Sequence, residues 1–317
     1  MIVRFWGVRG SIPAPMTSHE VKAKIVWALR MAMGHNLGDE GALKRFVDEL
    51  PQHIGGTYGG NTPCVQLQSG DTTTIIFDAG SGIRALGLDL MEGSFGQGTG
   101  TCHLFLSHTH WDHIQGLPFF LPAHVPGNRI IIYSPHADME ERLKAQQAPA
   151  YFPVPLESME ADIEFFPLAE AETIRLDELR VSSIELKHPG GSFGYRVEKQ
   201  GASFVYATDT ALNDLSESEQ EQFTPFFSHA KVVVIDAQYT AEEAASKETW
   251  GHSSPLAGVD MALRAGVETL VLFHHEPTHD DQALHEKFER ARKYVESKRQ
   301  NQACAVLMAY EGLQLAV

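Results

Sequence analysis

Residues 107–113 of the chain read Ser-His-Thr-His-Trp-Asp-His, directly after an apolar run. In extended backbone, side chains two positions apart point in the same direction, so His108 and His110 can reach one metal ion together. If the chain then turns into a helix, Asp112 and His113 swing toward a second position. Imidazole nitrogen and carboxylate oxygen are ligands that suit zinc, iron or manganese. This run therefore predicts a strand that ends in a metal-binding loop with room for two ions.

Short β-rich runs bounded by turn residues recur along the chain, with helical patterns between them. Helices are expected at 254–265 and 282–298, the first with Ser253 or Ser254 as its N-cap and Gly266 past its end. This alternation favours an α/β fold, a layered sandwich of sheets and helices. The strands are expected at 2–7, 64–68, 74–78, 102–107, 129–133, 163–167, 179–186, 193–198, 203–207, 231–236, 269–273 and 304–309.

Residues 18–50 interrupt this order with two expected helices. Ser18 can cap the first helix, and Pro51 ends the second. Apolar residues at positions 43, 46, 47 and 50 give the second helix an amphipathic stripe. The segment 14–56 is therefore predicted to be a helical insertion near the N-terminus, which leaves open whether it is a packing element, a lid or a dimer contact.

The length and composition limit the number of domains and the cellular compartment. The chain has 317 residues, 43% of them hydrophobic, which suits one large domain or two moderate ones, and a single domain over 1–317 is expected. No apolar run reaches the ~18 residues that span a bilayer, and the start does not resemble a signal peptide, so a cytoplasmic protein is expected. The cysteines are far apart and beside apolar segments, so they are expected to be buried and reduced. They are Cys64, Cys102 and Cys304.

The net charge indicates which classes of partner the chain can bind. Forty-one acidic residues against 25 basic ones give a formal net charge of −16. Such a surface repels polyanions unless a basic patch compensates, and the basic residues fall on expected helices among acids. A long nucleic acid is therefore not expected as a partner. A small anion remains compatible with this charge, because bound metal ions bring positive charge into a site.

Lone histidines and aspartates follow other expected strands. Asp78, His188, Asp209 and His274 each come directly or closely after an apolar run. Each is a weak signal alone, because a histidine at a strand end is more often a hydrogen-bonded structural residue. Together with 107–113 they predict a site that is assembled from several strand ends.

In this order the motifs resemble those of the metallo-β-lactamase-fold hydrolase superfamily. Asp78, the cluster at 108–113, His188, Asp209 and His274 are similar to its motifs one to five. The resemblance covers almost the whole chain outside the insertion. It implies a four-layer αββα sandwich with a two-metal site at the edge of the paired sheets.

The resemblance also implies two divalent metal ions per chain, with zinc expected before manganese or iron. Asp209 would bridge them together with a hydroxide, the expected nucleophile, where true β-lactamases typically have a cysteine. Asp78 would support the site through hydrogen bonds. His275 directly follows His274 and is an alternative ligand, although His274 is favoured. The first metal would be bound by His108, His110 and His188, and the second by Asp112, His113 and His274.

Residues 249–255 read Thr-Trp-Gly-His-Ser-Ser-Pro, with Asp236 upstream. They resemble the Gly-His-Ser-Thr segment and its acidic partner in the superfamily's phosphodiesterase branch, which includes transfer-RNA 3′-processing endonucleases and cyclic-phosphate diesterases. There the histidine contacts the phosphate and helps to protonate the leaving oxygen. His252 would therefore be the general acid, unless it is only a locally bonded helix-start residue. Asp236 replaces a glutamate and Ile235 a histidine, which weakens the match to the RNA-processing enzymes.

Two more segments, 5–13 and 58–63, resemble a bacterial subgroup that is often described as related to class II cyclic-nucleotide phosphodiesterases. Within the second, Asn61 is a candidate for site support or substrate contact, and equally for a simple turn residue. The aromatic segment 150–155 can stack a base or cover the core, and the second role is favoured.

The sequence thus predicts a dinuclear metal-dependent phosphodiesterase that acts on a small nucleotide-like or cyclic diester. Its expected catalytic residues are His252, Asp236 and Asp112, and homodimer formation is left open. The alternatives are a transfer-RNA 3′-processing endonuclease, a lactonase or other ester hydrolase, and a metal-binding protein without turnover. The endonuclease should carry a basic, Gly-rich arm, and no such arm is evident in the sequence.

Overall fold

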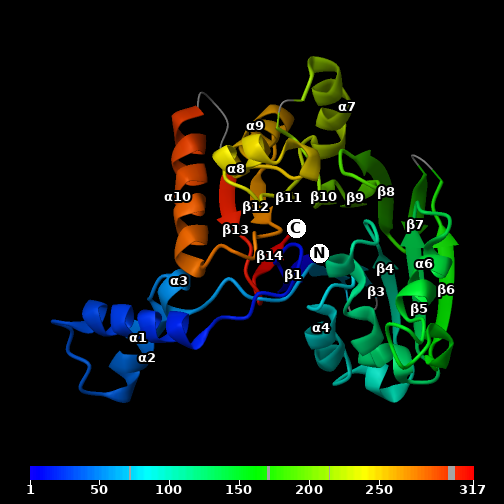
Figure 1. The fold of residues 1–317 in the computed structure, drawn as a ribbon, viewed down its shortest axis with the longest axis horizontal. Coiled ribbons are helices and arrows are strands. Elements are labelled where there is room, and N and C mark those ends of the chain that lie inside the picture. The colour runs from blue at the N-terminus through cyan, green and yellow to red at the C-terminus, as the bar shows by residue number, and fades with distance from the viewer. Residues whose placement is uncertain (71–72, 170–171, 214, 299–303) are drawn as a thin grey trace.

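Two mixed β-sheets face each other between outer helices in the computed structural model, which describes residues 1–70, 73–169, 172–213, 215–298 and 304–317 (Figure 1). The first sheet contains, in spatial order, β14 (Gln314–Ala316), β1 (Ile2–Gly7), β2 (Cys64–Ser69), β3 (Thr73–Phe77), β4 (Thr101–Phe105), β5 (Arg129–Ser134) and β6 (Asp162–Pro167). The second contains β13 (Ala305–Met308), β12 (Thr269–Phe273), β11 (Val232–Asp236), β10 (Ala202–Ala207), β9 (Ser192–Lys199), β8 (Leu179–Leu186) and β7 (Thr173–Leu176).

The helices lie outside the two sheets. The short β7 and β14 were not predicted, whereas the other strands match expected runs to within two residues. The α-helices are α1 (Ser18–Ala32), α2 (Glu40–Asp48), α3 (Gln52–Gly55), α4 (Ile83–Leu90), α5 (Trp111–Ile114), α6 (Met139–Gln146), α7 (Glu217–Phe227), α8 (Ala241–Ser246), α9 (Pro255–Ala265) and α10 (Asp281–Lys298). Single 3₁₀ turns are η1 (Ser94–Gln97), η2 (Leu117–Phe119), η3 (Leu121–His124), η4 (Leu156–Ser158) and η5 (Glu248–Trp250).

Alternation along the central strands produces the layers. In β11, Val232 and Val234 face the core between the sheets, whereas Val233 and Ile235 face the core under α7, α9 and α10. A third apolar core joins the first sheet to α4 and α6. The predicted four-layer αββα sandwich is confirmed.

Parallel pairing decides where the site can lie. Strands β3 to β6 run parallel to one another in the first sheet, as do β10 to β13 in the second. Carboxyl ends of parallel strands meet at one edge of a sheet. The residues that follow β3, β4, β10, β11 and β12 are therefore gathered at the edges of the two facing sheets.

Segment 14–56 is helical, as expected, but its first cap differs from the prediction. Thr17, not Ser18, is the N-cap of α1, because its hydroxyl accepts a hydrogen bond from the Glu20 N–H and the Glu20 carboxylate accepts one from the Thr17 N–H. Neither α1 nor α2 contains a buried residue. Both helices lie to one side of the sandwich (Figure 1).

Two further expectations concern burial. The cysteines are buried, as predicted. Tyr151 contradicts the prediction that 150–155 covers the core, because its side chain is 83% exposed.

The helix predicted at 254–265 is confirmed as α9, because Ser254 is its N-cap and Gly266 ends it with φ 68°. Among the residues that the structure describes, none of the helices combines the length and hydropathy that a bilayer span requires.

Candidate metal centre

Predicted ligand residues from five different elements converge at the carboxyl ends of the strands. His108 follows β4 and Asp209 follows β10, so they come from opposite sheets. His274 follows β12, and His188 comes two residues after β8. Because the strands are held by their own pairing and packing, the site is built on the rigid part of the fold.

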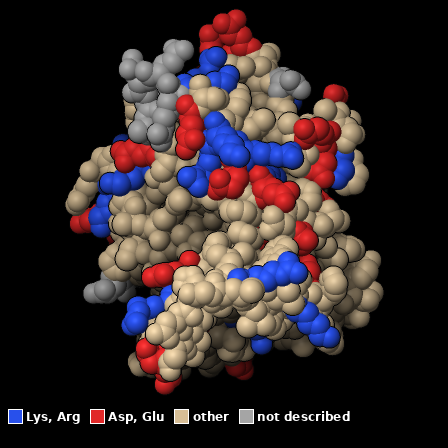
Figure 2. All heavy atoms as spheres, turned by 90° about the vertical axis from the view of Figure 1, so that its left-hand side faces the viewer, with Lys and Arg blue, Asp and Glu red and all other residues tan. Residues whose placement is uncertain are grey.

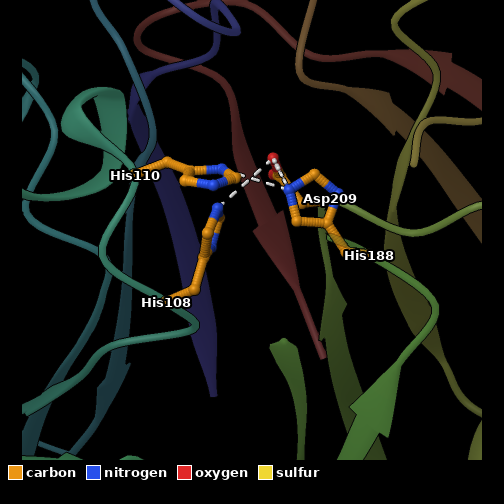
Figure 3. A group of neighbouring side chains, drawn as sticks. All are labelled: His108, His110, His188 and Asp209. Atoms are coloured by element: carbon orange, nitrogen blue, oxygen red, sulfur yellow. Dashed lines mark hydrogen bonds and ion pairs between the residues drawn. The ribbon is translucent and has the colours of Figure 1, made fainter. Parts of the chain in front are cut away.

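The first group contains His108, His110, His188 and Asp209, whose donor atoms all lie within 4.8 Å of one another (Figure 3). His108 Nε2 and His188 Nε2 lie 3.7 Å and 3.8 Å from Asp209 Oδ1. His110 approaches with its Nδ1, which is 3.1 Å from His188 Nε2. Three imidazoles and one carboxylate oxygen around a common point form a set that can hold one divalent cation.

The second group contains Asp112, His113 and His274. Asp112 Oδ2 lies 3.2 Å from His113 Nε2 and 3.1 Å from His274 Nε2. Asp209 Oδ2 lies 3.1 Å and 3.3 Å from the same two nitrogens. Asp209 therefore presents one oxygen to each group, which is the arrangement expected of a bridging carboxylate.

Hydrogen bonds on the far side of the rings fix which nitrogen faces the site. The Nδ1–H of His188 donates to Gly251 O at 2.9 Å, that of His113 to Asp78 Oδ2 at 2.8 Å, and that of His274 to Gln238 Oε1 at 3.1 Å. A carbonyl or a carboxylate only accepts, so each Nδ1 carries the proton. The Nε2 lone pairs are left for a cation, the usual arrangement for metal-binding histidines.

The protonation states of the clustered residues also suit metal ions. His108 Nε2 is buried and has no hydrogen-bond partner among the described residues. Burial, with His113 nearby, lowers the pKa of His108 well below its usual range, so this imidazole is neutral. Burial would raise the pKa of Asp209, but His113, His274 and His108 hold it well below its usual range. Neutral imidazole and ionised carboxylate are the forms that bind metals.

The three carboxylates around His113 favour a positive charge between them. Burial lowers the pKa of His113, but Asp209, Asp112 and Asp78 together raise it well above its usual range. A proton on His113 would answer the same negative charge as a cation between the two groups. The site therefore favours a cation at the position that His113 Nε2 faces, and a metal would compete with that proton.

Backbone strain coincides with the site. Of the seven non-glycine residues with positive φ in the described part of the chain, four are Ser11 (63°), Asp78 (60°), Asp209 (53°) and His274 (58°). This conformation costs on the order of 1 kcal/mol per residue, so surrounding contacts must hold it. At Ser11, the backbone N–H donates to Asp112 Oδ2 at 2.7 Å. The strained turns thus aim side chains and one N–H at the centre.

His252 lies beside both groups. Its Nδ1–H donates to Asp236 Oδ2 at 2.7 Å. Its ring stacks on His274 with centroids 5.1 Å apart, and lies 5.1 Å from the ring of His188. Burial lowers the pKa of His252, but Asp236 outweighs it and raises the pKa to about 9. The predicted acid and its partner are therefore brought together next to the predicted ligands.

Two candidates lie outside the cluster. The side chain of Asn61 donates to Glu311 Oε2 at 3.0 Å and accepts from Ser81 Oγ at 3.0 Å. His275 is buried and donates through Nε2 to Ala309 O at 2.8 Å. Because the positive φ of His274 turns the chain, these successive side chains point to different places. Of His274 and His275, the structure places only His274 among the clustered residues.

Several supporting residues were not anticipated. Tyr206 Oη and Ser107 Oγ each donate to Asp78 Oδ2 at 2.8 Å, which holds the carboxylate that orients His113. Gln238 donates to Glu276 Oε2 at 2.8 Å while it accepts from His274. Gln238 stands two positions after Asp236, a spacing that could have indicated a shared direction.

Comparison with known proteins identifies the family of the chain. Residues 73–275 match the protein family described as the β-lactamase superfamily domain. An uncharacterized protein of Mycobacterium tuberculosis is 27% identical over 182 residues, 55% of this chain and 62% of that protein, so less than two thirds of that relative is matched. Ribonuclease Z of Picrophilus torridus is 23% identical over 272 residues, which cover 70% of this chain and 82% of that protein.

Solved structures agree in fold. YhfI of Bacillus subtilis, a metallo-β-lactamase fold protein, is 18% identical with a TM-score of 0.63, covering 99% of this chain and 98% of that one. Zn²⁺-bound PqqB from Methylobacterium extorquens is 14% identical with a TM-score of 0.64, covering 100% of both chains. The family match spans more than half of the 317 residues. The chain therefore belongs to the metallo-β-lactamase superfamily, as a distant relative of ribonuclease Z.

Proposed function

We propose that this protein is a two-metal hydrolase that cleaves small phosphodiesters. The observation that carries the proposal is the pair His252–Asp236, bonded at 2.7 Å, beside two groups of metal-ligand type. Hydrolysis of a diester needs a nucleophile, neutralisation of the phosphoryl oxygens and a proton for the leaving alkoxide. The ligand groups and the pair together provide for all three.

When bound, two divalent ions supply Lewis-acid chemistry, which activates water and neutralises phosphoryl charge. Zinc is the metal we propose first, because imidazole-rich sites suit it and because PqqB, a Zn²⁺-bound protein, has the same fold. His108, His110 and His188 would hold one ion. Asp112, His113 and His274 would hold the other, with Asp209 between them.

His252 would protonate the leaving oxygen through Nε2, since Nδ1 is held by Asp236. Asp236 is itself fixed, because its Oδ1 accepts from the backbone N–H of Ser253 at 3.0 Å and of Gln238 at 3.1 Å. This fixed carboxylate favours the protonated ring. A thioester releases a thiolate, which needs this proton less, so the pair favours substrates that release an alkoxide, such as phosphodiesters.

Charge supports a small substrate. The net charge is −16, and on the face that carries α1 and α10 the Lys and Arg side chains lie among Asp and Glu (Figure 2). Long RNA binds through many phosphate contacts with basic groups. A small diester requires only the local charge of the metal centre. The relationship to ribonuclease Z supports phosphodiester chemistry at such a site but leaves the size of the substrate to be tested.

The test compares leaving groups in zinc-loaded protein. His252→Ala should reduce kcat/KM for 2′,3′-cyclic AMP by roughly 10²–10⁴, because the alkoxide leaves without its proton. Bis(p-nitrophenyl) phosphate should suffer a clearly smaller loss, since p-nitrophenolate needs no acid. His19→Ala, on α1, is the matched control and should change neither substrate. Equal losses on both substrates would refute the acid role, and absence of diester hydrolysis in the metal-loaded wild type would refute the proposed function.

A further inference from the structure

A cleft of about 790 Å³ lies on the outer side of the metal-binding loop. Thr109 and Trp111 line it, and they alternate in sequence with His108, His110 and Asp112 of the metal centre. The loop thus has two faces, one toward the candidate metals and one toward the cleft. A volume of this size suits a small organic ligand.

Aromatic rings are exposed around this cleft. Trp111 and Tyr151 are both 83% exposed, and Phe119 is 52% exposed. Phe119 packs edge-on against Phe152 with centroids 5.6 Å apart, which gives the cleft a fixed apolar wall. Large aromatic side chains left this open at one place mark a binding surface more often than chance exposure.

Polar groups are placed beside the rings. Arg142 donates through Nη1 to Thr109 Oγ1 at 3.1 Å and pairs through Nε with Asp138 at 2.9 Å, so its guanidinium is held at the cleft wall. Gln146 donates through Nε2 to Ile114 O at 2.8 Å. Its Oε1 is buried and has no hydrogen-bond partner among the described residues. The cleft thus offers flat apolar faces and a planar cation.

We propose that this cleft binds the nucleobase of the substrate, while the phosphodiester lies at the metal centre on the other face of the loop. The inference rests on the proposed function and narrows it to nucleotide diesters. A base offers a flat π-face to the exposed rings of Trp111 and Tyr151. A lipid or sugar diester has no flat ring to stack on these side chains.

The test isolates the base by comparing 5′-AMP with ribose 5-phosphate, which shares the sugar phosphate but lacks the ring. Binding to zinc-loaded protein is measured by calorimetry, so hydrolysis is not required. Wild-type protein should bind 5′-AMP roughly tenfold or more tightly than ribose 5-phosphate. Tyr151→Ala should remove most of this preference and leave ribose 5-phosphate unchanged. Tyr151→Phe, which keeps the ring, should retain it.

The variant Trp111→Leu is a second test of base stacking in the cleft. It should also reduce the preference for 5′-AMP, by roughly 5- to 100-fold, and its metal content is measured because Trp111 stands between two candidate ligands. An unchanged preference in both Tyr151→Ala and a metal-loaded Trp111→Leu would overturn the proposal, as would equal binding of the two probes by the wild type. A wild-type dimer that Tyr151→Ala dissociates would also overturn it, because a second copy would then cover the cleft.

The two proposals fail separately. Hydrolysis of bis(p-nitrophenyl) phosphate with no preference for 5′-AMP would overturn the nucleobase cleft and spare the phosphodiesterase. A Tyr151-dependent preference for 5′-AMP in protein that hydrolyses no diester would support the cleft and overturn the phosphodiesterase.

Discussion

Gly10 lies so close to His274 that a β-carbon there would fall 2.6 Å from the ring atoms Cε1 and Nδ1. A methyl group must therefore push the imidazole away from Asp112 and Asp209. We expect Gly10→Ala to bind about one metal per chain instead of two, measured by plasma mass spectrometry of dialysed protein. Gly93→Ala is the control, because the nearest atom to its β-carbon is 3.7 Å away. Two metals retained in Gly10→Ala would contradict this role of Gly10.

Gln238 is the acceptor that orients His274. Gln238→Ala leaves the Nδ1–H without this partner and frees the ring to turn. Loss of such a supporting hydrogen bond typically weakens metal binding by roughly 10- to 100-fold. Competition with a chelator should show this weakening for the second metal only. Gln282→Ala, a change on α10, should behave like the wild type, and equal chelator resistance of the two variants would argue against an orienting role for Gln238.

At this scale the sequence could predict the candidate ligands and one support, Asp78, but not the other supports. His108, Asp209 and His274 were predictable because each follows an apolar strand with a parallel neighbour, and the ends of parallel strands converge. His188 follows β8, which pairs antiparallel on both sides, so only its place after an apolar run indicated it. The spacing of Gln238 from Asp236 indicates at most a shared direction, and its role could not be assigned because its partners His274 and Glu276 come from a segment far along the chain. The positive φ values at the site were equally hidden, because tertiary contacts impose them on residues that do not prefer them.

At the scale of elements, α10 is tied to the loop that carries the acid. Lys287 on α10 is buried and donates through Nζ to Ala237 O at 2.7 Å and to Gln238 O at 2.9 Å. These carbonyls directly follow Asp236 in the chain. The helix therefore holds the backbone between the Asp236–His252 pair and the support of His274.

This lysine predicts a pH dependence of stability. Burial lowers the pKa of Lys287 from 10.5 to about 7. Between these values the unfolded chain keeps the proton that the folded protein has lost, so stability rises with pH. The free energy of unfolding of the wild type, minus that of Lys287→Met, should therefore increase by about 1–3 kcal/mol from pH 7 to pH 9. Urea unfolding at both pH values measures it, and parallel profiles would contradict the buried, neutral lysine.

The elements differ in how visible they are in the sequence. Central strands such as β10 and β11 are runs of apolar residues because they are covered on both faces. The short edge strands β7 and β14 have no such run and were missed. Tyr151 was misplaced for a related reason, since an aromatic residue beside prolines has the same composition whether it covers a core or faces a cleft.

At the scale of the whole molecule, charge should exclude long RNA. The net charge is −16, and basic side chains on the face in Figure 2 are interspersed with acidic ones. Structured RNA should therefore bind with a Kd of roughly 100 µM or weaker at physiological salt, measured by fluorescence anisotropy. Cleavage of a transfer-RNA precursor with micromolar binding would instead favour the RNA-processing alternative.

The whole fold was the easiest feature to predict and the substrate the hardest. The order of Asp78, 108–113, His188, Asp209 and His274 resembles that of the superfamily's motifs, and this resemblance implies two sheets with the site at their edge. What binds outside the metal centre depends on surfaces such as the cleft at Trp111. Those surfaces are shaped by segments whose sequences carry no fixed pattern.

The central claim is that two metals held by these residues perform diester hydrolysis. The most direct measurement is a titration of metal-free protein with Zn²⁺, in which bound metal and hydrolysis of bis(p-nitrophenyl) phosphate are followed in the same samples. The account predicts saturation at two metals per chain, with full activity only when the second is bound. Saturation at one metal with full activity, or two bound metals without hydrolysis, would contradict it.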